Sequence, residues 1–232
     1  MEKIPLVIGR QSSGEEFIVD LEVLPHLFIS HSNDKQLQNI FIQLIGNIVH
    51  SEIELHLSIS LSRRMGLLIK PLVPLESLFM EFSHNDFEDG KINSIDEFVT
   101  SLMIEKKNRA TLIKKSSIPI AMFPTMIIFI DNIFEIIMGQ QKKTALSFIE
   151  LLMTAASVKM FFISGSAGIY RPLLDQLINV SPLLKKKLKK SFQDQLITQP
   201  LGAELVINPD GLLFFRERNE KIYTRLYQAQ IT

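Results

Sequence analysis

The sequence predicts an α/β fold in which helices cover both faces of a mostly parallel central sheet. Three short apolar runs, at residues 26–30, 126–130 and 160–164, carry this prediction. Such runs are typical of strands that are buried on both faces in a parallel sheet. Segments with apolar residues at helical spacing alternate with these runs, and this alternation is the usual order of elements in α/β domains.

The composition agrees with a single packed domain over residues 1–232. Apolar residues make up 46% of the chain and charged residues 22%, which is typical of globular proteins rather than of disordered chains. The formal net charge is zero, so no overall positive field attracts nucleic acid. The chain has no cysteine, which excludes disulfides, thiolate nucleophiles and cysteine-ligated zinc.

The apolar stretch 118–138 has the hydropathy of a membrane span but not its pattern. Two prolines interrupt it, and Asp131 and Glu135 place charges in its second half. A charge inside a bilayer is costly, and the unbroken apolar run is shorter than the roughly 20 residues that span a membrane. We therefore interpret this stretch as a buried strand followed by a helix.

The chain begins with an expected β-hairpin, because apolar strands at residues 6–9 and 17–21 flank the turn-forming segment 11–14. The buried strand at residues 26–30 follows, and a polar stretch leads from it into a helix. That helix is predicted over residues 37–49, where apolar side chains recur at helical spacing.

A further strand is expected over residues 54–61. Ser94 and Glu97 have the spacing of a capping box, so they mark the start of another helix with an apolar stripe. The segment 65–93, between the expected strand and this helix, shows no clear periodicity of apolar residues. The expected basic end of this helix consists of Lys106, Lys107 and Arg109.

The last third of the chain is expected to contain a helix over residues 145–156 and a short one over 173–178. Apolar strands at residues 204–207 and 212–216 flank Asn-Pro-Asp-Gly at 208–211, which predicts a second hairpin. The two hairpins would add antiparallel edges to the parallel sheet.

The first expected ligand site follows the strand at residues 26–30, because ligands of parallel α/β sheets bind at the carboxyl ends of strands. In P-loop proteins the motif GxxxxGK[ST] occupies this place, where its glycines and lysine surround the phosphates. An ungapped alignment sets His31 and Gln36 on the glycines, Leu37 on the lysine and Gln38 on the hydroxyl residue. Lys35 lies two residues before the lysine position.

The second expected site follows the strand at residues 126–130. An apolar strand that ends in an acid is the Walker B pattern, whose aspartate helps to hold Mg²⁺. Asp131 keeps that acid, but Asn132 stands where a glutamate would polarise the attacking water, and an amide cannot accept a proton as a carboxylate does. Alternatively, Asp131 simply caps the next helix.

Taken in order, these segments resemble the ATPase domains of the FtsK/SpoIIIE family. The resemblance rests on Pro5-Leu6-Val7-Ile8-Gly9 in the first hairpin, on Leu24-Pro25-His26-Leu27-Phe28 before the altered loop, and on residues 123–138 around Asp131. Ser166 stands where the family has the glutamine of its sensor strand. The resemblance implies a RecA-like P-loop NTPase fold with a mostly parallel sheet.

Within that family, the chain is most similar to the last ATPase-like domain of type VII secretion coupling proteins (EssC/EccC). This resemblance implies a catalytically inactive domain of a larger, membrane-anchored protein, located on the cytoplasmic side of the membrane. It implies partners among exported proteins of the WXG100 type and among neighbouring ATPase domains, and it implies no cofactor. The degenerate nucleotide pocket would comprise His31, Ser32, Asn33, Asp34, Lys35, Gln36, Leu37, Gln38, Asp131, Asn132 and Ser166.

Two alternatives stay open. ATP with Mg²⁺ would be a regulatory ligand if residues such as Lys35 and Asp131 still contact phosphate or metal. A DNA-translocating or conjugation-coupling module would need a basic surface, for which the five lysines within residues 185–190 are the candidate. We interpret those lysines as the solvated face of a helix and do not expect DNA as a partner.

Overall fold

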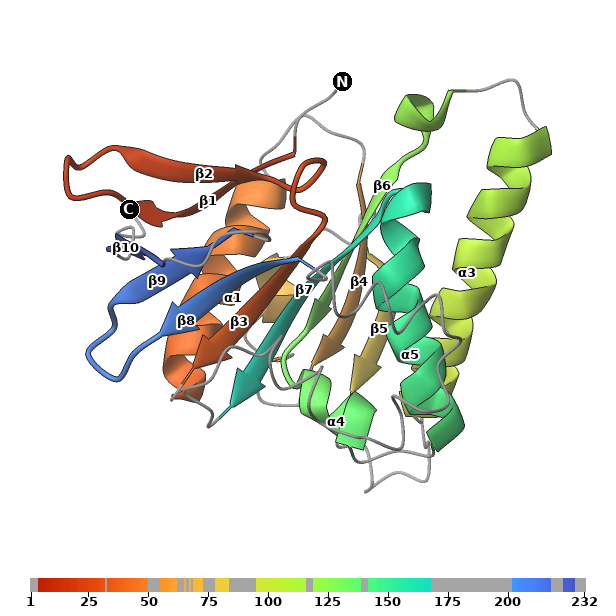
Figure 1. Ribbon diagram of the computed structural model, residues 1–232. Coiled ribbons are helices and arrows are strands. Elements are labelled where there is room, and N and C mark those ends of the chain that lie inside the picture. Colours follow the sequence, from red (N-terminus) through yellow and green to blue (C-terminus); the bar gives the residue numbers. More distant parts are fainter. Residues whose placement is uncertain are drawn as a thin grey trace. The chain divides into compact units, whose positions relative to one another are not determined.

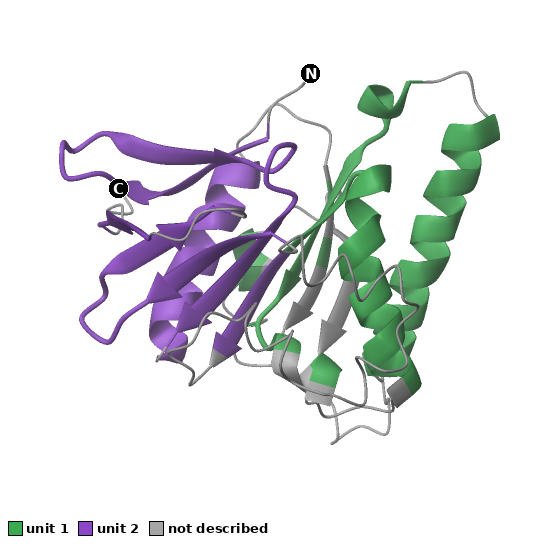
Figure 2. Cartoon of the chain, viewed as in Figure 1, with its two compact units in different colours: residues 1–2, 52–162 green, residues 3–51, 163–232 purple. Residues whose placement is uncertain are grey.

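A computed structural model describes residues 4–31, 33–49, 55–61, 65, 67, 69–72, 78–83, 95–115, 119–138, 142–167, 202–217 and 223–227. Figures 1 and 2 show its elements and its two compact units. Unit 1 comprises residues 1–2 and 52–162, and unit 2 comprises residues 3–51 and 163–232. That residues 1–232 form one domain stays a prediction.

Unit 2 begins with the predicted hairpin, in which β1 (Pro5–Arg10) pairs antiparallel with β2 (Glu16–Asp20). The turn between them uses Gly14 at φ 88°, a left-handed conformation that favours glycine. The register shifts between Val7 and Gly9, and the Val7 carbonyl accepts a hydrogen bond of 2.8 Å from Gln43 Nε2. This bond joins β1 to the helix α1 (Asp34–Val49).

The sheet of unit 2 is built on β3 (His26–His31), which is buried along its whole length. β3 pairs in parallel with β8 (Ala203–Ile207), and β9 (Leu213–Arg216) and β10 (Thr224–Leu226) continue the sheet antiparallel. The turn between β8 and β9 uses Gly211 at φ 81°. α1 covers this sheet with the apolar face that the periodicity predicts, namely Leu37, Ile40, Phe41, Leu44, Ile45 and Ile48.

The sheet of unit 1 is parallel and has the order β6-β4-β5. β4 (Leu55–Leu61) pairs with both β6 (Thr125–Ile130) and β5 (Leu78–Ser83). Every residue of β6 is buried, as expected for a central strand that is covered on both faces. β7 (Met160–Ala167) starts in unit 1 and continues into unit 2 after Phe162.

Two long helices of unit 1, α3 (Ile95–Lys115) and α5 (Lys142–Thr154), pack side by side (Figure 1). The short helix α4 (Ile133–Met138) also packs on α5, and the 3-10 helices are Lys70–Leu72, Ile120–Met122 and Ala155–Val158. None of the described helices is both long and apolar enough to cross a membrane.

Arg109 on α3 lies in a different environment from the expected basic helix end. It is buried, and its guanidinium donates to the carbonyl of Pro124 at 2.6 Å and to Glu105 Oε1 at 2.8 Å. The third guanidinium nitrogen, Nη2, lies 3.3 Å from His56 Nδ1 on β4. Arg109 therefore fastens α3 to the start of β6 and to β4, while the exposed basic end of the helix is formed by Lys114 and Lys115.

The predicted fold class is confirmed, because mostly parallel strands are flanked by helices. The second hairpin adds the antiparallel strand β9 next to β8, whereas the first hairpin, β1–β2, forms a two-stranded sheet of its own. β5 and β10 were not predicted as separate elements, whereas α4 is the helix expected after the buried strand within residues 118–138. The proposed cap at Ser94, the short helix at 173–178 and the lysines of 185–190 lie outside the described residues.

Candidate functional site

The connection between β3 and α1 is the place where a P-loop would bind phosphate. β3 ends at His31 and α1 begins at Asp34, so only residues 32 and 33 separate the strand from the helix. In a P-loop, the GxxxxGK[ST] motif follows the strand as a glycine-rich loop and leads into the N-terminus of the helix. Here the first position of the aligned octet is part of the strand and the last five are part of the helix. Only two residues of the aligned octet therefore lie between the strand and the helix.

The backbone at this connection is already engaged in helix capping. Asn33 accepts a hydrogen bond from the Lys35 N–H through its side chain at 2.8 Å, which is the usual bond of an N-cap asparagine. The Asn33 carbonyl accepts from the N–H groups of Gln36 and Leu37. Some of the N–H groups that a P-loop would direct at phosphate therefore serve α1 itself.

The side chains at the glycine and lysine positions have structural roles. Gln36 donates from Nε2 to the carbonyls of Asn208 and Pro209, at 3.1 and 3.2 Å, and so ties α1 to the turn between β8 and β9. Leu37, at the lysine position, is only 2% exposed and packs in the core. Gln38, at the hydroxyl position, is also buried, whereas Asp34 and Lys35 are exposed.

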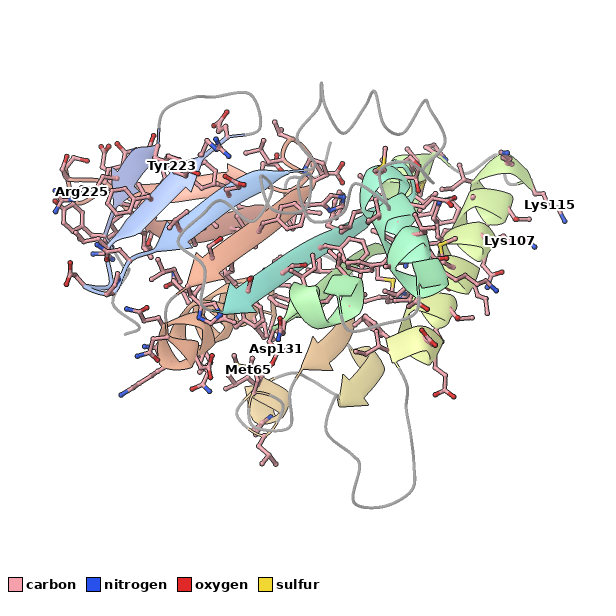
Figure 3. The ribbon with its side chains drawn as sticks, turned by 60° about the horizontal axis from the view of Figure 1, so that its bottom comes forward. Met65, Lys107, Lys115, Asp131, Tyr223 and Arg225 are labelled. Atoms are coloured by element: carbon pink, nitrogen blue, oxygen red, sulfur yellow. The ribbon has the colours of Figure 1, made fainter. Side chains whose placement is uncertain are left out.

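Three further predicted residues lie at strand ends. Asp131 directly follows β6 and is 7% exposed, and Asn132 separates it from α4, which begins at Ile133 (Asp131 is labelled in Figure 3). Ser166, near the end of β7, is buried, and its hydroxyl has no hydrogen-bond partner among the described residues. His31, the last residue of β3, is buried as well.

The predicted pocket residues are divided between the two units. Unit 2 contains those from the β3–α1 region together with Ser166, and unit 1 contains Asp131 and Asn132. Ser32 lies outside the described residues. Within the part of the chain that the structure describes, no group of three or more histidines and acids is arranged to hold a metal ion.

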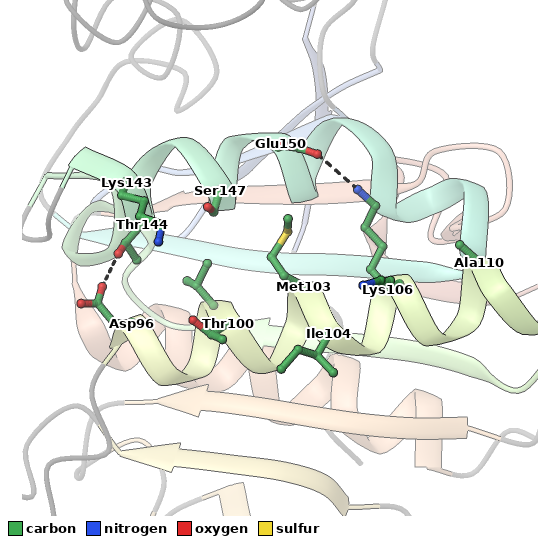
Figure 4. A pocket seen from close by; sticks show the side chains of 12 residues that line it. Asp96, Thr100, Met103, Ile104, Lys106, Ala110, Lys143, Thr144, Ser147 and Glu150 are labelled. Atoms are coloured by element: carbon green, nitrogen blue, oxygen red, sulfur yellow. Dashed lines mark hydrogen bonds and ion pairs between the residues drawn. The ribbon is translucent and has the colours of Figure 1, made fainter.

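A groove that the sequence did not reveal runs between α3 and α5 of unit 1 (Figure 4). It has a volume of about 710 Å³, and apolar and charged side chains line it together. Only the packing of the two helices brings these side chains together, since about 40 residues of sequence separate the two sets. The residues that line it are Asp96, Val99, Thr100, Met103, Ile104, Lys106, Lys107, Ala110, Lys143, Thr144, Ser147 and Glu150.

No protein-family model and no curated protein matches the chain in sequence. Its structure, however, is similar to solved ATPase domains. One similar structure is Thermomonospora curvata EccC (ATPases 2 and 3), which was solved in complex with a signal sequence peptide. The match covers 98% of this chain and 41% of the EccC chain, with a TM-score of 0.60 and 12% sequence identity. The chain also matches 44% of EssC (ATPases 2 and 3) from Geobacillus thermodenitrificans at 0.58 and 14% identity.

The chain has the fold of an FtsK-like P-loop ATPase domain. The conjugation coupling protein TcpA of pCW3, solved with ATPγS, gives a further match over 98% of this chain and 66% of that one, at a TM-score of 0.57 and 11% identity. The RecA-like fold that the resemblance implied is thus confirmed. The chain spans less than half of the EccC and EssC chains, which carry more than one ATPase domain.

Proposed function

We propose that this chain is an ATPase-like domain that binds protein partners in a type VII secretion coupling protein and does not hydrolyse ATP. The observation that carries the proposal is the connection of residues 32 and 33 between β3 and α1, together with the burial of Leu37 where a P-loop has its lysine. Without that lysine and without a loop of sufficient length, the γ-phosphate lacks the groups that position it for transfer.

The fold and its neighbours support the secretion assignment. EccC and EssC are type VII secretion ATPases with several such domains, and one EccC structure holds a signal sequence peptide. By analogy, the partners proposed for this chain are exported proteins of the WXG100 type and the neighbouring ATPase domains of a longer protein. Its place would then be at the cytoplasmic side of the membrane that anchors that protein.

Calorimetric titration of the full chain with ATP and Mg²⁺ tests the proposal. Calorimetry is preferred to intrinsic fluorescence because the chain has no tryptophan. We expect no binding heat and no turnover above background from protein that is folded by circular dichroism. We further expect a purified WXG100-type protein to bind with the same affinity with and without ATP. Turnover by the purified chain would refute the proposal.

Regulatory ATP binding is the second candidate, since Asp131 is retained at the end of β6. If ATP binds in the micromolar range, Asp131→Asn should lower the affinity for ATP only in the presence of Mg²⁺. Lys35→Ala should lower this affinity with or without the metal. Binding that neither substitution changes would place the nucleotide elsewhere on the chain.

A further inference from the structure

We infer that the groove between α3 and α5 binds an amphipathic helix of a partner protein whose apolar stripe is flanked by acidic residues. The inference deepens the proposed function and rests on its claim that the domain acts by binding partners. The groove lies wholly within unit 1, and every residue that lines it is described.

The apolar part of the groove comes mainly from α3. Val99 is buried and Met103 is half-buried, and Ala110 lies further along the helix than Met103 (Met103 and Ala110 are labelled in Figure 4). Ile104 is 56% exposed, which is high for an isoleucine that lines a groove. Burying such a side chain against a partner would remove apolar surface from water and favour association.

The charges that line the groove are unequally compensated. Lys106 is engaged, because its Nζ donates to Thr154 Oγ1 at 2.5 Å and lies 3.8 Å from Glu150. Asp96 is engaged by the hydroxyl of Thr144.

Two other lysines that line the groove lack such acidic partners among the described residues. Lys107 on α3 and Lys143 on α5 are exposed, and neither has an acidic partner among the residues that the structure describes. These cations come from both helices, so a partner with acids on both sides of its apolar stripe complements them.

The walls of the groove favour a helix over an extended peptide. Both walls are α-helices, whose interior N–H and C=O groups bond within each helix, so the groove has no free strand edge to pair with. A bound segment must satisfy its own backbone hydrogen bonds, as a helix does. From Asp96 to Ala110 the groove extends about 21 Å along α3, which accommodates roughly four turns of a partner helix.

The test uses two fluorescein-labelled helical peptides with the same leucine stripe, one flanked by glutamates and the other by lysines. Fluorescence anisotropy with the full chain should show binding of the acidic peptide and at least about tenfold weaker binding of the basic one. The variant Lys107→Glu/Lys143→Glu should lose about tenfold in affinity for the acidic peptide. Ile104→Asp should reduce it by a similar factor.

A matched control lies on the same helix. Lys114→Glu/Lys115→Glu changes the net charge of the chain by the same amount, but neither lysine lines the groove, and Figure 3 shows Lys107 and Lys115 separated along α3. This variant should keep the affinity within about twofold. An equal loss in both variants would mean a general charge effect and would overturn the inference.

Methionine methyl NMR gives an independent readout on the unmodified chain. Met103 lines the groove, whereas Met122 is 72% exposed and lies outside it, so the acidic peptide should shift only the Met103 resonance. A Met103 signal that does not move would overturn the inference. Anionic vesicles that bind through Lys107 and Lys143, without peptide binding, would assign the groove to a membrane surface instead. Because these measurements contain no nucleotide, their failure is distinct from a failure of the proposed pseudo-ATPase.

Discussion

Gln36, on the first turns of α1, donates a hydrogen bond of 3.1 Å to the backbone carbonyl of Asn208, in the turn between β8 and β9. A P-loop has a glycine at this aligned position, because the backbone there must approach phosphate closely. In this chain the same position carries a long side chain that connects two elements far apart in the sequence. Gln36 therefore fastens α1 to the turn between β8 and β9.

Removing the Gln36 contact should destabilise the fold. Gln36→Ala deletes the bonds to the carbonyls of Asn208 and Pro209, and we expect a loss of about 1–2 kcal/mol in the free energy of unfolding, measured by urea denaturation. Lys35→Ala, at the exposed neighbouring position, should change it by less than about 0.5 kcal/mol. Equal effects of the two variants would mean that the contact contributes nothing.

Restoring the P-loop residues should not restore nucleotide binding. The triple variant Gln36→Gly/Leu37→Lys/Gln38→Ser matches the motif at its last positions, but the connection still comprises only residues 32 and 33. In protein that circular dichroism shows to be folded, we expect no calorimetric signal with ATP and Mg²⁺. Micromolar binding by this variant would show that the connection can lengthen by unwinding the first turn of α1.

Leu37 itself should not tolerate a charge. Leu37→Lys places an ammonium group where the side chain is 2% exposed, and we expect a destabilisation of about 3 kcal/mol or more. Leu37→Met, which nearly conserves the side-chain volume, should cost less than about 1.5 kcal/mol. Thermal denaturation of both variants measures the difference, and a well-tolerated lysine would place this side chain near solvent.

Arg109 should be needed for the packing of α3. Arg109→Met keeps most of the side-chain volume but removes the donors to Glu105 and Pro124, so it should destabilise the chain by about 2–4 kcal/mol. Lys107→Met, two positions earlier and exposed, should be close to neutral. If both variants unfold at the same urea concentration, the buried network around Arg109 is not stabilising.

Two glycines of unit 2 should respond oppositely to alanine. A Cβ on Gly202 would lie 2.2 Å from the carbonyl oxygen of His26, so Gly202→Ala should destabilise the fold by several kcal/mol. A Cβ on Gly46 meets no atom within 4 Å, and in the middle of α1 the substitution Gly46→Ala should stabilise by about 0.5–1 kcal/mol. Melting temperatures that shift in the same direction would contradict this contrast.

Local signals in the sequence were sufficient to predict most of the fold. The hairpins were predictable because Gly14 and Gly211 adopt positive φ in the turns, and β6 because a strand buried on both faces is apolar throughout. β5 was not predicted, because it lies within the segment 65–93, whose prolines and acidic residues obscure any period. The hydrogen bonds of Arg109 reach residues 15 and 53 positions away, a distance that helical spacing does not encode.

The candidate site was predictable in part. The motif alignment located the place at the end of β3 but not the length of the connection. The helix-start signal that was missed is Asn33 with Gln36 three residues later, which places the start of α1 at Asp34. The groove between α3 and α5 depends on how the two helices pack, so the residues that line it could not be grouped from sequence alone.

The short connection after β3 bears on how long a partner stays bound. Motor domains change their affinity for partners as ATP is hydrolysed, because the γ-phosphate bound at the P-loop holds switch segments that are released on hydrolysis. If the proposed function is correct, a domain whose strand passes almost directly into a capped helix would have no such sensor. Its affinity for a partner would be the same in starved and in energy-rich cells. The partner would stay bound through every hydrolysis cycle of the neighbouring ATPase domains.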